Sequence, residues 1–549
     1  MSHRWPRWFA LVAALLFLDA SLTFHNIWPT PAVRWTGELS LELAACLLVL
    51  AAAHRVVGRP TPGVLAVLSA LWILLIVGRF AEVTAPALFG RDINLYWDLR
   101  FVPGVTALLV RAAPVWLVAA AGLFTLLVFA LLYRSVRWAL GRVADAAANP
   151  VEQRALAVLA AAIVVLFLVQ PSGAEPPGFP VVAVPVTLTY ARQVRLMAAA
   201  FVGPTSIAAS PSLSSDFARV AGADVFLIFV ESYGAVTYER PEFAAGLAAS
   251  RARFDAAIRE TKRDVVSAYV ESPTFGGSSW LAHISLLAGV EVRDPATNAL
   301  LMTQKRDTLV TAFARHRYRT VALMPGLWQR WPEGAFYGFD EIYGGARLAY
   351  QGPPFGWFDV PDQVSLAKLD AIEASRPSRA PLFVFFPTIS THTPFRPTPP
   401  YQSDWPRVLT DRPFDEADVT SAFLKYSDWL NLGPSYVDAV SYDFATFGGY
   451  LRARGDRDFV MILVGDHQPP ALVSGEGAPW DVPVHVIASR PRILERLLAR
   501  GFRPGLTPAR PAIGRMHELQ QVLLDAFGDR APGSVDAAAS VAPGLPSLP

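Results

Sequence analysis

Two acidic residues and a histidine follow apolar runs of this sequence, at positions where they could bind a metal ion. Glu231 comes directly after the run Val225–Val230, and Asp466 and His467 come after Phe459–Val464 with one glycine between. Two carboxylates and an imidazole suit a divalent cation, Mn²⁺ in the first place and Zn²⁺ or Mg²⁺ as alternatives. Each residue alone would also fit an ordinary loop or turn. Their joint occurrence predicts one metal ion.

A serine nucleophile is predicted within residues 274–289, Thr-Phe-Gly-Gly-Ser-Ser-Trp-Leu-Ala-His-Ile-Ser-Leu-Leu-Ala-Gly. Gly276 and Gly277 permit a tight turn, and the apolar residues after them have helical spacing. Ser278 or Ser279 would therefore begin a helix, where backbone N–H groups and the positive end of the helix dipole favour an anionic ester. A serine that only caps the helix fits the same pattern, so both serines and both interpretations stay open.

Six short β-branched or aromatic runs could position these side chains, and segments long enough for helices separate them. The runs are Val225–Val230, Val265–Val270, Thr320–Met324, Leu382–Pro387, Phe459–Val464 and Val482–Ala488. This alternation predicts an α/β domain with a mainly parallel sheet sandwiched by helices. Because ligands gather beyond the carboxyl ends of parallel strands, we expect the polar residues after the runs to converge.

The amino-terminal part of the chain is too apolar for a soluble domain. Of the 549 residues, 53% are hydrophobic and only 17% are charged, and the mean hydropathy is +0.33. Five apolar stretches approach the roughly 20 residues that cross a bilayer. They are Trp8–Phe24, Leu39–Ala53, Val64–Val83, Ala113–Leu132 and Ala155–Val169. The prediction is a five-helix transmembrane domain over residues 1–170.

Arginines in the short loops predict the orientation of these helices. With a cytoplasmic amino terminus, eight loop arginines fall inside and four outside, as the positive-inside rule favours. We therefore expect a multi-pass inner-membrane protein with a juxtamembrane linker over 171–223, a periplasmic catalytic domain over 224–528 and a disordered tail over 529–549. The net charge of +2 provides no basic field, so nucleic acid is not expected as a partner.

The catalytic segment resembles the alkaline phosphatase and sulfatase superfamily. With its anchor, the whole chain resembles the lipoteichoic acid synthase and phosphoethanolamine transferase group of that superfamily. Val-Glu231-Ser-Tyr-Gly and Val-Gly-Asp466-His467-Gln are similar to the family's metal-binding elements. The resemblance implies one metal ion that is bound by Glu231, Asp466, His467 and the nucleophile.

The nucleophile of that family, a threonine or in sulfatases a modified cysteine, stands six residues before the small residue of an Ala-Ser-Leu-Leu-Thr-Gly-like helix. Ile-Ser285-Leu-Leu-Ala-Gly has this form, so the count selects Ser279, with Ser278 as the alternative. Sulfatases also carry proline or alanine two residues after the nucleophile and arginine four residues after it. This chain has Leu281 and His283 there, so formylglycine sulfatase chemistry is not expected.

Four further residues are predicted to contact the substrate. The segment 324–340 is similar to the Trp-x-Arg segment with which lipoteichoic acid synthases hold glycerol phosphate, which implies this role for Trp328 and Arg330. Thr-His392-Thr-Pro-Phe is similar to the family's Ser-His-x-Pro element, whose histidine contacts the substrate or assists the leaving group. His283 is the fourth candidate because it lies one helical turn after the predicted nucleophile. Surface ion pairing, loop packing and burial in the core are the structural alternatives for Arg330, His392 and His283.

The predicted function is a double displacement at the outer face of the membrane. Ser279 attacks a phospholipid donor such as phosphatidylglycerol or phosphatidylethanolamine, diacylglycerol leaves, and a glycan or lipid acceptor collects the headgroup from the phosphoserine. The anchor favours a lipid donor because it raises the effective concentration of lipid at the site. A periplasmic phosphatase or sulfatase-type hydrolase, and a catalytically silent receptor or scaffold of the same fold, are the alternatives.

Overall fold

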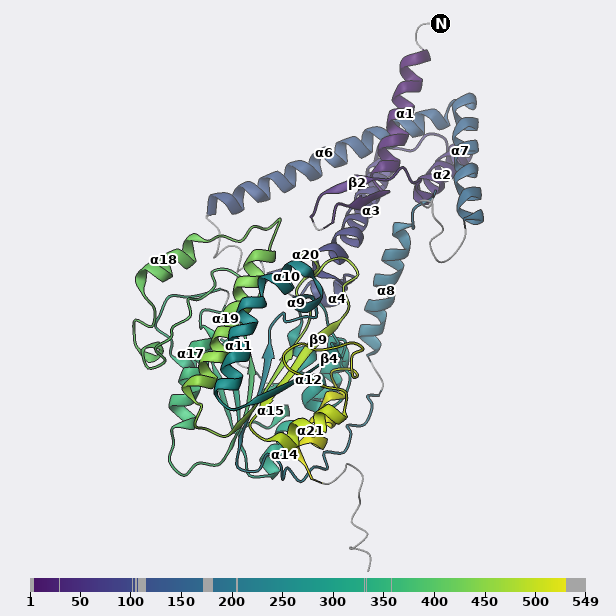
Figure 1. Cartoon of the computed structure of the whole chain (residues 1–549). Coiled ribbons are helices and arrows are strands. Elements are labelled where there is room, and N and C mark those ends of the chain that lie inside the picture. Colours follow the sequence, from purple (N-terminus) through teal and green to yellow (C-terminus); the bar gives the residue numbers. More distant parts are fainter. Residues whose placement is uncertain are drawn as a thin grey trace, which may run out of the picture. The chain divides into compact units, whose positions relative to one another are not determined.

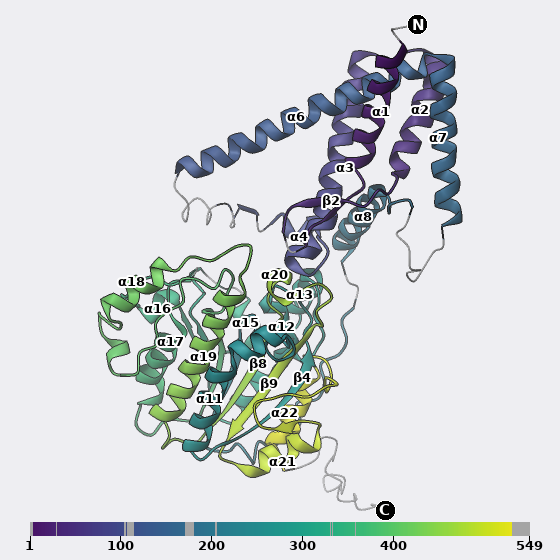
Figure 2. The same ribbon diagram turned by 45° about the horizontal axis from the view of Figure 1, so that its top comes forward.

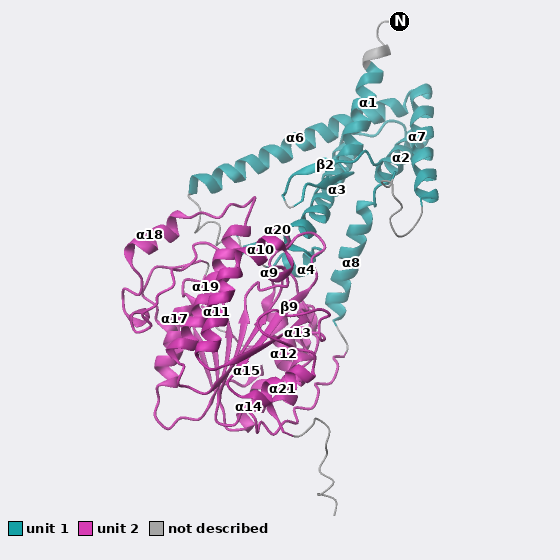
Figure 3. Cartoon of the chain, in the orientation of Figure 1, with its two compact units in different colours: residues 1–203 teal, residues 204–549 magenta. Residues whose placement is uncertain are grey.

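The computed structural model describes residues 4–28, 30–100, 102–103, 106, 115–170, 181–203, 206–329, 331, 333–356 and 358–529. The chain divides into two compact units, Met1–Gly203 and Pro204–Pro549 (Figure 3). Residues 171–180 of the predicted linker and the predicted tail beyond Asp529 lie outside the described residues. The predicted domain boundaries stay predictions.

Unit 1 consists of helices and one short antiparallel hairpin. Its elements are α1 (Arg4–Ala20), β1 (Phe24–Asn26), β2 (Val33–Trp35), α2 (Leu41–Val57), α3 (Pro62–Phe89), α4 (Leu95–Asp98), α6 (Val115–Ala147), α7 (Pro150–Val169) and α8 (Val186–Val202). Ser40, Thr61 and Asn149 accept hydrogen bonds from backbone N–H groups in the first turns of α2, α3 and α7. These N-caps explain where the three helices begin.

Three helices of the described chain are long and apolar enough to cross a membrane: α3, α6 and α7, with 28, 33 and 20 residues. Helices α1 and α2 lie at the other two predicted stretches with 17 residues each. Seventeen residues give about 26 Å of helix, slightly less than the roughly 30 Å of a hydrocarbon core. The structure thus supports three of the five predicted spans by length and composition.

Unit 2 contains an eight-stranded sheet with the order β10-β4-β9-β8-β3-β7-β5-β6. The strands are β3 (Asp224–Val230), β4 (Asp264–Glu271), β5 (Arg319–Met324), β6 (Glu341–Gly344), β7 (Leu382–Pro387), β8 (Phe459–Gly465), β9 (Asp481–Ala488) and β10 (Arg503–Pro504). All six predicted runs form strands, and β6 and β10 are additional. Strands β8, β3, β7, β5 and β6 pair in parallel.

The sheet is mixed, whereas a mainly parallel sheet is expected from the sequence. Between β8 and β9 the chain forms only the four-residue helix α20 (Ala471–Ser474). A helix this short cannot carry the crossover that a parallel connection needs, so β9 returns antiparallel to β8. Because β4 is antiparallel to β9, it runs in the direction of β8 again. The carboxyl ends of β3, β4, β7 and β8 therefore lie at one edge.

Helices cover both faces of this sheet (Figures 1 and 2). On one face lie α11 (Ala248–Glu260), α17 (Asp362–Leu369) and α19 (Gly433–Ala453), and on the other α12 (Ser279–Ala288), α14 (Leu309–Arg315), α21 (Pro491–Ala499) and α22 (Leu519–Phe527). Phe226 and Ile228 of β3 pack into the apolar cluster on the face covered by α11, α17 and α19. Leu227 and Phe229 pack into the cluster on the opposite face. This alternation follows the two-residue period of a strand that is buried on both sides.

The remaining elements of unit 2 are short. They are α9 (Val236–Glu239), α10 (Pro241–Gly246), α13 (Pro295–Met302), α15 (Gly334–Tyr337), α16 (Gly345–Leu348), α18 (Glu416–Leu424), the π-helical turn η1 (Asp370–Ala374) and the 3₁₀ turn η2 (Arg407–Leu409).

Candidate active site

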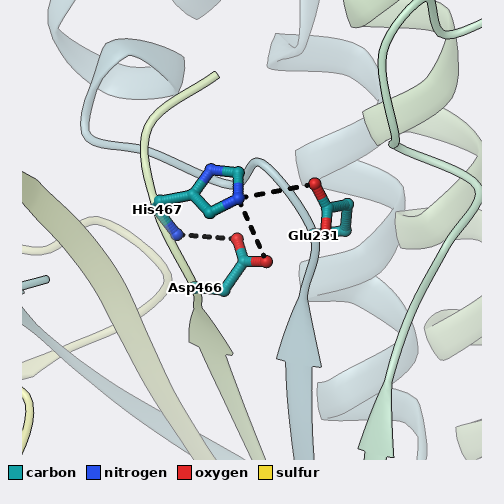
Figure 4. A group of neighbouring side chains, drawn as sticks. All are labelled: Glu231, Asp466 and His467. Carbon is teal, nitrogen blue, oxygen red and sulfur yellow. Dashed lines mark hydrogen bonds and ion pairs between the residues drawn. The ribbon is translucent and has the colours of Figure 1, made fainter. Parts of the chain in front are cut away.

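Three side chains that could bind a metal ion meet at the ends of the neighbouring strands β3 and β8 (Figure 4). Glu231 follows β3, and Asp466 and His467 follow β8. His467 Nε2 lies 3.6 Å from Glu231 Oε1 and 3.6 Å from Asp466 Oδ2. One ligand atom of each residue lies within 4.8 Å of the others, and all three residues are buried. The parallel pairing of β3 and β8 thus brings together residues that are far apart in the sequence.

The backbone next to this cluster is tightly constrained. A Cβ atom at Gly465 would lie 1.9 Å from the carbonyl oxygen of Tyr233, so only glycine fits between the two strand ends. Ser232 has a positive φ of 55°, an unfavourable conformation for a residue with a side chain. In this conformation its N–H donates to Asp466 Oδ1 at 2.8 Å, and its hydroxyl donates to Glu231 Oε1 at 2.9 Å. The strained turn therefore orients both carboxylates.

His467 presents a lone pair to the carboxylates. Its Nδ1 lies 2.8 Å from the carbonyl oxygen of Gln468, which can only accept, so Nδ1 carries the proton. Burial lowers the pKa of His467, and the neutral ring then has its lone pair on Nε2, the nitrogen that faces the cluster. An imidazole that is oriented through its other nitrogen is the usual arrangement of a metal ligand.

The charge of the cluster fits a divalent cation. Burial, followed by the negative charge of Glu231, raises the pKa of Asp466 well above its ordinary value. No lysine or arginine of the described chain forms an ion pair with Glu231 or Asp466. Two buried carboxylates without a cationic partner are costly, and a divalent ion among the two carboxylates and Nε2 would supply the missing charge. We conclude that these residues can hold one divalent metal ion.

Ser279 is the first residue of α12, and its hydroxyl faces the same cluster. Its Oγ donates to Glu231 Oε2 at 2.9 Å and lies 3.1 Å from His467 Nε2. Ser278, the other candidate, has a φ of 61°, and its side chain makes no capping bond with α12. The left-handed backbone conformation of Ser278 distinguishes the two serines, and Ser279 is the one whose side chain contacts the cluster. The amino end of α12, which favours anions, lies at the same place.

Of the four predicted substrate contacts, Trp328 and His392 converge on Phe358. The Nε1 of Trp328 donates to the Phe358 carbonyl oxygen at 3.3 Å, and the His392 ring lies edge-on to the Phe358 ring with 5.4 Å between the ring centres. His392 follows β7 and interacts electrostatically with Glu231 and His467. Trp328 is 49% exposed. Arg330 lies outside the described residues.

His283 is packed into the apolar layer between α12 and the sheet. Its ring centre lies 4.6 Å from that of Phe229 and 5.4 Å from that of Phe385. Burial lowers its pKa to about 3, so the ring is neutral, and its Nε2 has no hydrogen-bond partner among the described residues. The predicted contact of His283 with the substrate stays a prediction.

Two supporting residues were not found from the sequence. Thr388 Oγ1 accepts a hydrogen bond from the N–H of Glu231 at 3.0 Å, and Ser272 Oγ donates to the carbonyl oxygen of Asp466 at 2.5 Å. Thr388 comes directly after β7 and Ser272 directly after β4. Thr388 could have been found by the rule that selected Glu231, because it is the first polar residue after the run Leu382–Pro387. After Val265–Val270 the same rule selects Glu271 and so misses Ser272.

One family model matches a part of this chain. Residues 293–482 match the Sulfatase family model, a segment that includes His392, Asp466 and His467 but neither Glu231 nor Ser279. No curated protein is significantly similar to the chain in sequence.

The solved structures that are similar to the chain include three of low sequence identity. The integral membrane lipooligosaccharide phosphoethanolamine transferase A (EptA) from Neisseria meningitidis is 13% identical with a TM-score of 0.43, over 94% of this chain and 96% of that one. The lipoteichoic acid synthase LtaP from Listeria monocytogenes is 12% identical with a TM-score of 0.38, over 60% and 76%. The phosphoglycerol transferase GacH from Streptococcus pyogenes, in complex with sn-glycerol-1-phosphate, is 11% identical with a TM-score of 0.35, over 56% and 76%.

Proposed function

We propose, starting from the sulfatase-family segment 293–482, that this chain is a membrane-bound, metal-dependent transferase that moves a phospho-headgroup from a phospholipid to an envelope acceptor. The headgroup is phosphoglycerol or phosphoethanolamine, and the acceptor is a glycan or lipid hydroxyl. One observation carries the proposal: the Ser279 hydroxyl lies within 3.1 Å of both Glu231 and His467. A nucleophile thus contacts the groups that would bind the metal ion.

The first displacement forms the bond between Ser279 Oγ and phosphorus and breaks the bond between phosphorus and the diacylglycerol oxygen. The Ser279 proton passes to Glu231 Oε2, to which the hydroxyl already donates at 2.9 Å. A divalent cation held by Glu231, Asp466 and His467, Mn²⁺ in our proposal, would lower the pKa of the serine hydroxyl and stabilise the charge on the phosphate. The leaving diacylglycerol oxygen takes its proton from His392.

The second displacement reverses these roles. The acceptor hydroxyl gives its proton to His392 and attacks phosphorus, and Ser279 leaves and recovers its proton. Trp328 and Arg330 bind the headgroup, with the Arg330 guanidinium on phosphate oxygens. The exposed Trp328 ring is available for this contact, since only part of its surface is covered.

In this proposal the amino-terminal helices anchor the chain in the membrane that contains its phospholipid donor. We propose that α1, α2, α3, α6 and α7 all cross the inner membrane, with the amino terminus in the cytoplasm and unit 2 in the periplasm. The apolar lengths of α3, α6 and α7 support the anchor, and the loop arginines support its orientation. Tethering raises the effective concentration of phospholipid at the site over that of a soluble ester.

The test uses the full chain in phospholipid nanodiscs that contain phosphatidylglycerol and phosphatidylethanolamine, with added Mn²⁺. Mass spectrometry of the peptide that carries both serines should show a phospho-headgroup adduct on Ser279. Ser279→Ala should abolish the adduct and lower turnover at least about 1,000-fold, as expected for a nucleophile. Ser278→Ala is the matched control and should keep both.

Other results would redirect the proposal. An adduct on Ser278 would transfer the nucleophile to the neighbouring residue. Turnover of a soluble aryl phosphate or sulfate without any turnover of phospholipid would favour the hydrolase. An inert wild-type chain without a bound divalent ion would favour a silent receptor or scaffold.

A further inference from the structure

A second pair of buried carboxyl groups lies in unit 2, and the proposed reaction does not use it. Asp362 is the first residue of α17, and Asp443 lies in the middle of α19. Both residues are 0% exposed. The two carboxyl groups lie close enough to interact with each other, and Asp443 Oδ1 is buried without a hydrogen bond to any other described residue. The two residues are far apart in the sequence.

This pair binds the segment that leads to His392. The N–H groups of Ile389 and Ser390 donate to the Asp362 carboxylate at 3.0 and 2.8 Å. The hydroxyl of Thr391 donates to Asp443 Oδ2 at 3.4 Å. The three residues directly before His392 are therefore each bonded to one of the two acids.

The two carboxyl groups can share a contact only if one of them is protonated. Two adjacent negative charges in a buried site repel each other, and such a pair keeps one proton. No lysine or arginine of the described chain pairs with either group, and the titratable neighbour is the buried Tyr442, whose hydroxyl accepts the N–H of Gln363 at 3.2 Å. Asp362 already accepts two backbone N–H bonds, which stabilise its anion, so the proton belongs to Asp443.

We infer that Asp443, as a neutral acid that donates to Asp362, and Asp362, as a carboxylate that accepts from Ile389 and Ser390, form a clamp that positions His392. Both are positioning residues, because they act through the loop and do not touch the reacting atoms. The consequence for catalysis rests on the proposed function of His392. The position of the loop is set by the clamp whether or not His392 has that function.

Two isosteric substitutions separate this clamp from simple packing. Asp443→Asn keeps a neutral side chain whose amide can donate to Asp362 and whose carbonyl can accept from Thr391. Its kcat and KM should stay within about threefold of wild type. Asp362→Asn removes the negative charge and places an amide group opposite the N–H groups of Ile389 and Ser390. Its kcat should fall about 100-fold, the scale expected for a catalytic group displaced by about 1 Å, with little change in KM.

Hydrogen exchange of the full chain provides a readout that does not depend on activity. The amides of Ile389 and Ser390 should exchange faster in Asp362→Asn and at the wild-type rate in Asp443→Asn. Asp224→Asn is the matched control, because Asp224 is a buried carboxylate that accepts the N–H of Leu382 at 2.8 Å at the opposite end of β7. It should leave the exchange of the 389–390 amides unchanged.

If Asp362→Asn does not fold, Asp443→Leu replaces it in the comparison. Leucine cannot donate to Asp362, so the 389–390 amides should lose protection in Asp443→Leu and keep it in Asp443→Asn. Equal exchange rates in the two variants at position 443, or equal losses of kcat in Asp443→Asn and Asp362→Asn, would overturn the clamp. A wild-type chain that transfers no headgroup would refute the proposed function and leave the exchange test valid.

Discussion

Unit 2 neutralises its two pairs of buried carboxyl groups in different ways. Glu231 and Asp466 face the lone pair of His467 Nε2, and within the described residues neither forms an ion pair with a lysine or arginine. Asp362 and Asp443 face backbone N–H groups and each other. In the first pair several acceptor atoms point to one place, which suits a cation. In the second pair acceptors face donors, which suits a single shared proton.

The comparison shows that a third group determines what a buried acid pair binds. An imidazole whose Nδ1 is already used as a donor, as in His467, contributes a lone pair and leaves a deficit of positive charge. The amides of Ile389 and Ser390 contribute protons instead and stabilise one anion. We therefore propose a chemical role for the carboxyl groups of the first pair and a structural role for those of the second.

The largest effect is expected from comparing asparagine substitutions in the two pairs. Asp466→Asn removes a charged ligand, so the affinity for Mn²⁺ should fall more than about 100-fold, and turnover should be lost with it. Asp443→Asn should bind Mn²⁺ as the wild type does. Metal analysis after equilibrium dialysis, together with turnover, measures both. Equal metal content in the two variants would contradict the difference between the pairs.

The pH dependence of stability gives a smaller effect. Burial, followed by the negative charge of Asp362, raises the pKa of Asp443 well above its ordinary value of 3.8. Above pH 3.8 the folded protein therefore holds a proton that the unfolded chain releases. The free energy of unfolding should fall as the pH rises toward the folded-state pKa, by up to about 1.4 kcal/mol per pH unit.

Asp443→Asn has no such proton, so its stability relative to wild type should increase with pH over the same window. Thermal unfolding of both proteins in detergent between about pH 5 and about pH 8, above the ordinary pKa of an aspartate, tests this. Parallel curves for the two proteins would mean that Asp443 does not retain its proton.

The smallest effect is expected at Thr391. Thr391→Val removes the hydroxyl that donates to Asp443 at 3.4 Å and should cost about 1 kcal/mol of unfolding free energy, the usual value of one hydrogen bond. Thr391→Ser restores a hydroxyl and should recover most of that loss. If valine and serine have the same stability, this hydroxyl does not contribute to the clamp.

Much of unit 2 could be predicted because its signals are local. The six predicted runs all form strands, since a strand buried on both faces needs a continuous apolar run. Glu231, Asp466 and His467 meet as expected, because the ends of parallel neighbours share an edge. The resemblance to the alkaline phosphatase and sulfatase superfamily is confirmed for residues 293–482 by the family match.

The sequence by itself determined which residue types stand at the strand ends, and so the chemistry they could perform, because that placement depends only on where apolar runs stop. Only the tertiary structure decided that Ser279 and not Ser278 contacts the cluster, since the left-handed φ of Ser278 sets the direction of α12. The tertiary structure also brings Asp362 and Asp443 together, which could not be predicted because nothing in the sequence of either helix indicates its partner. Whether an acid binds a metal ion or keeps a proton depends on groups that reach it across the fold, and no local pattern contains them.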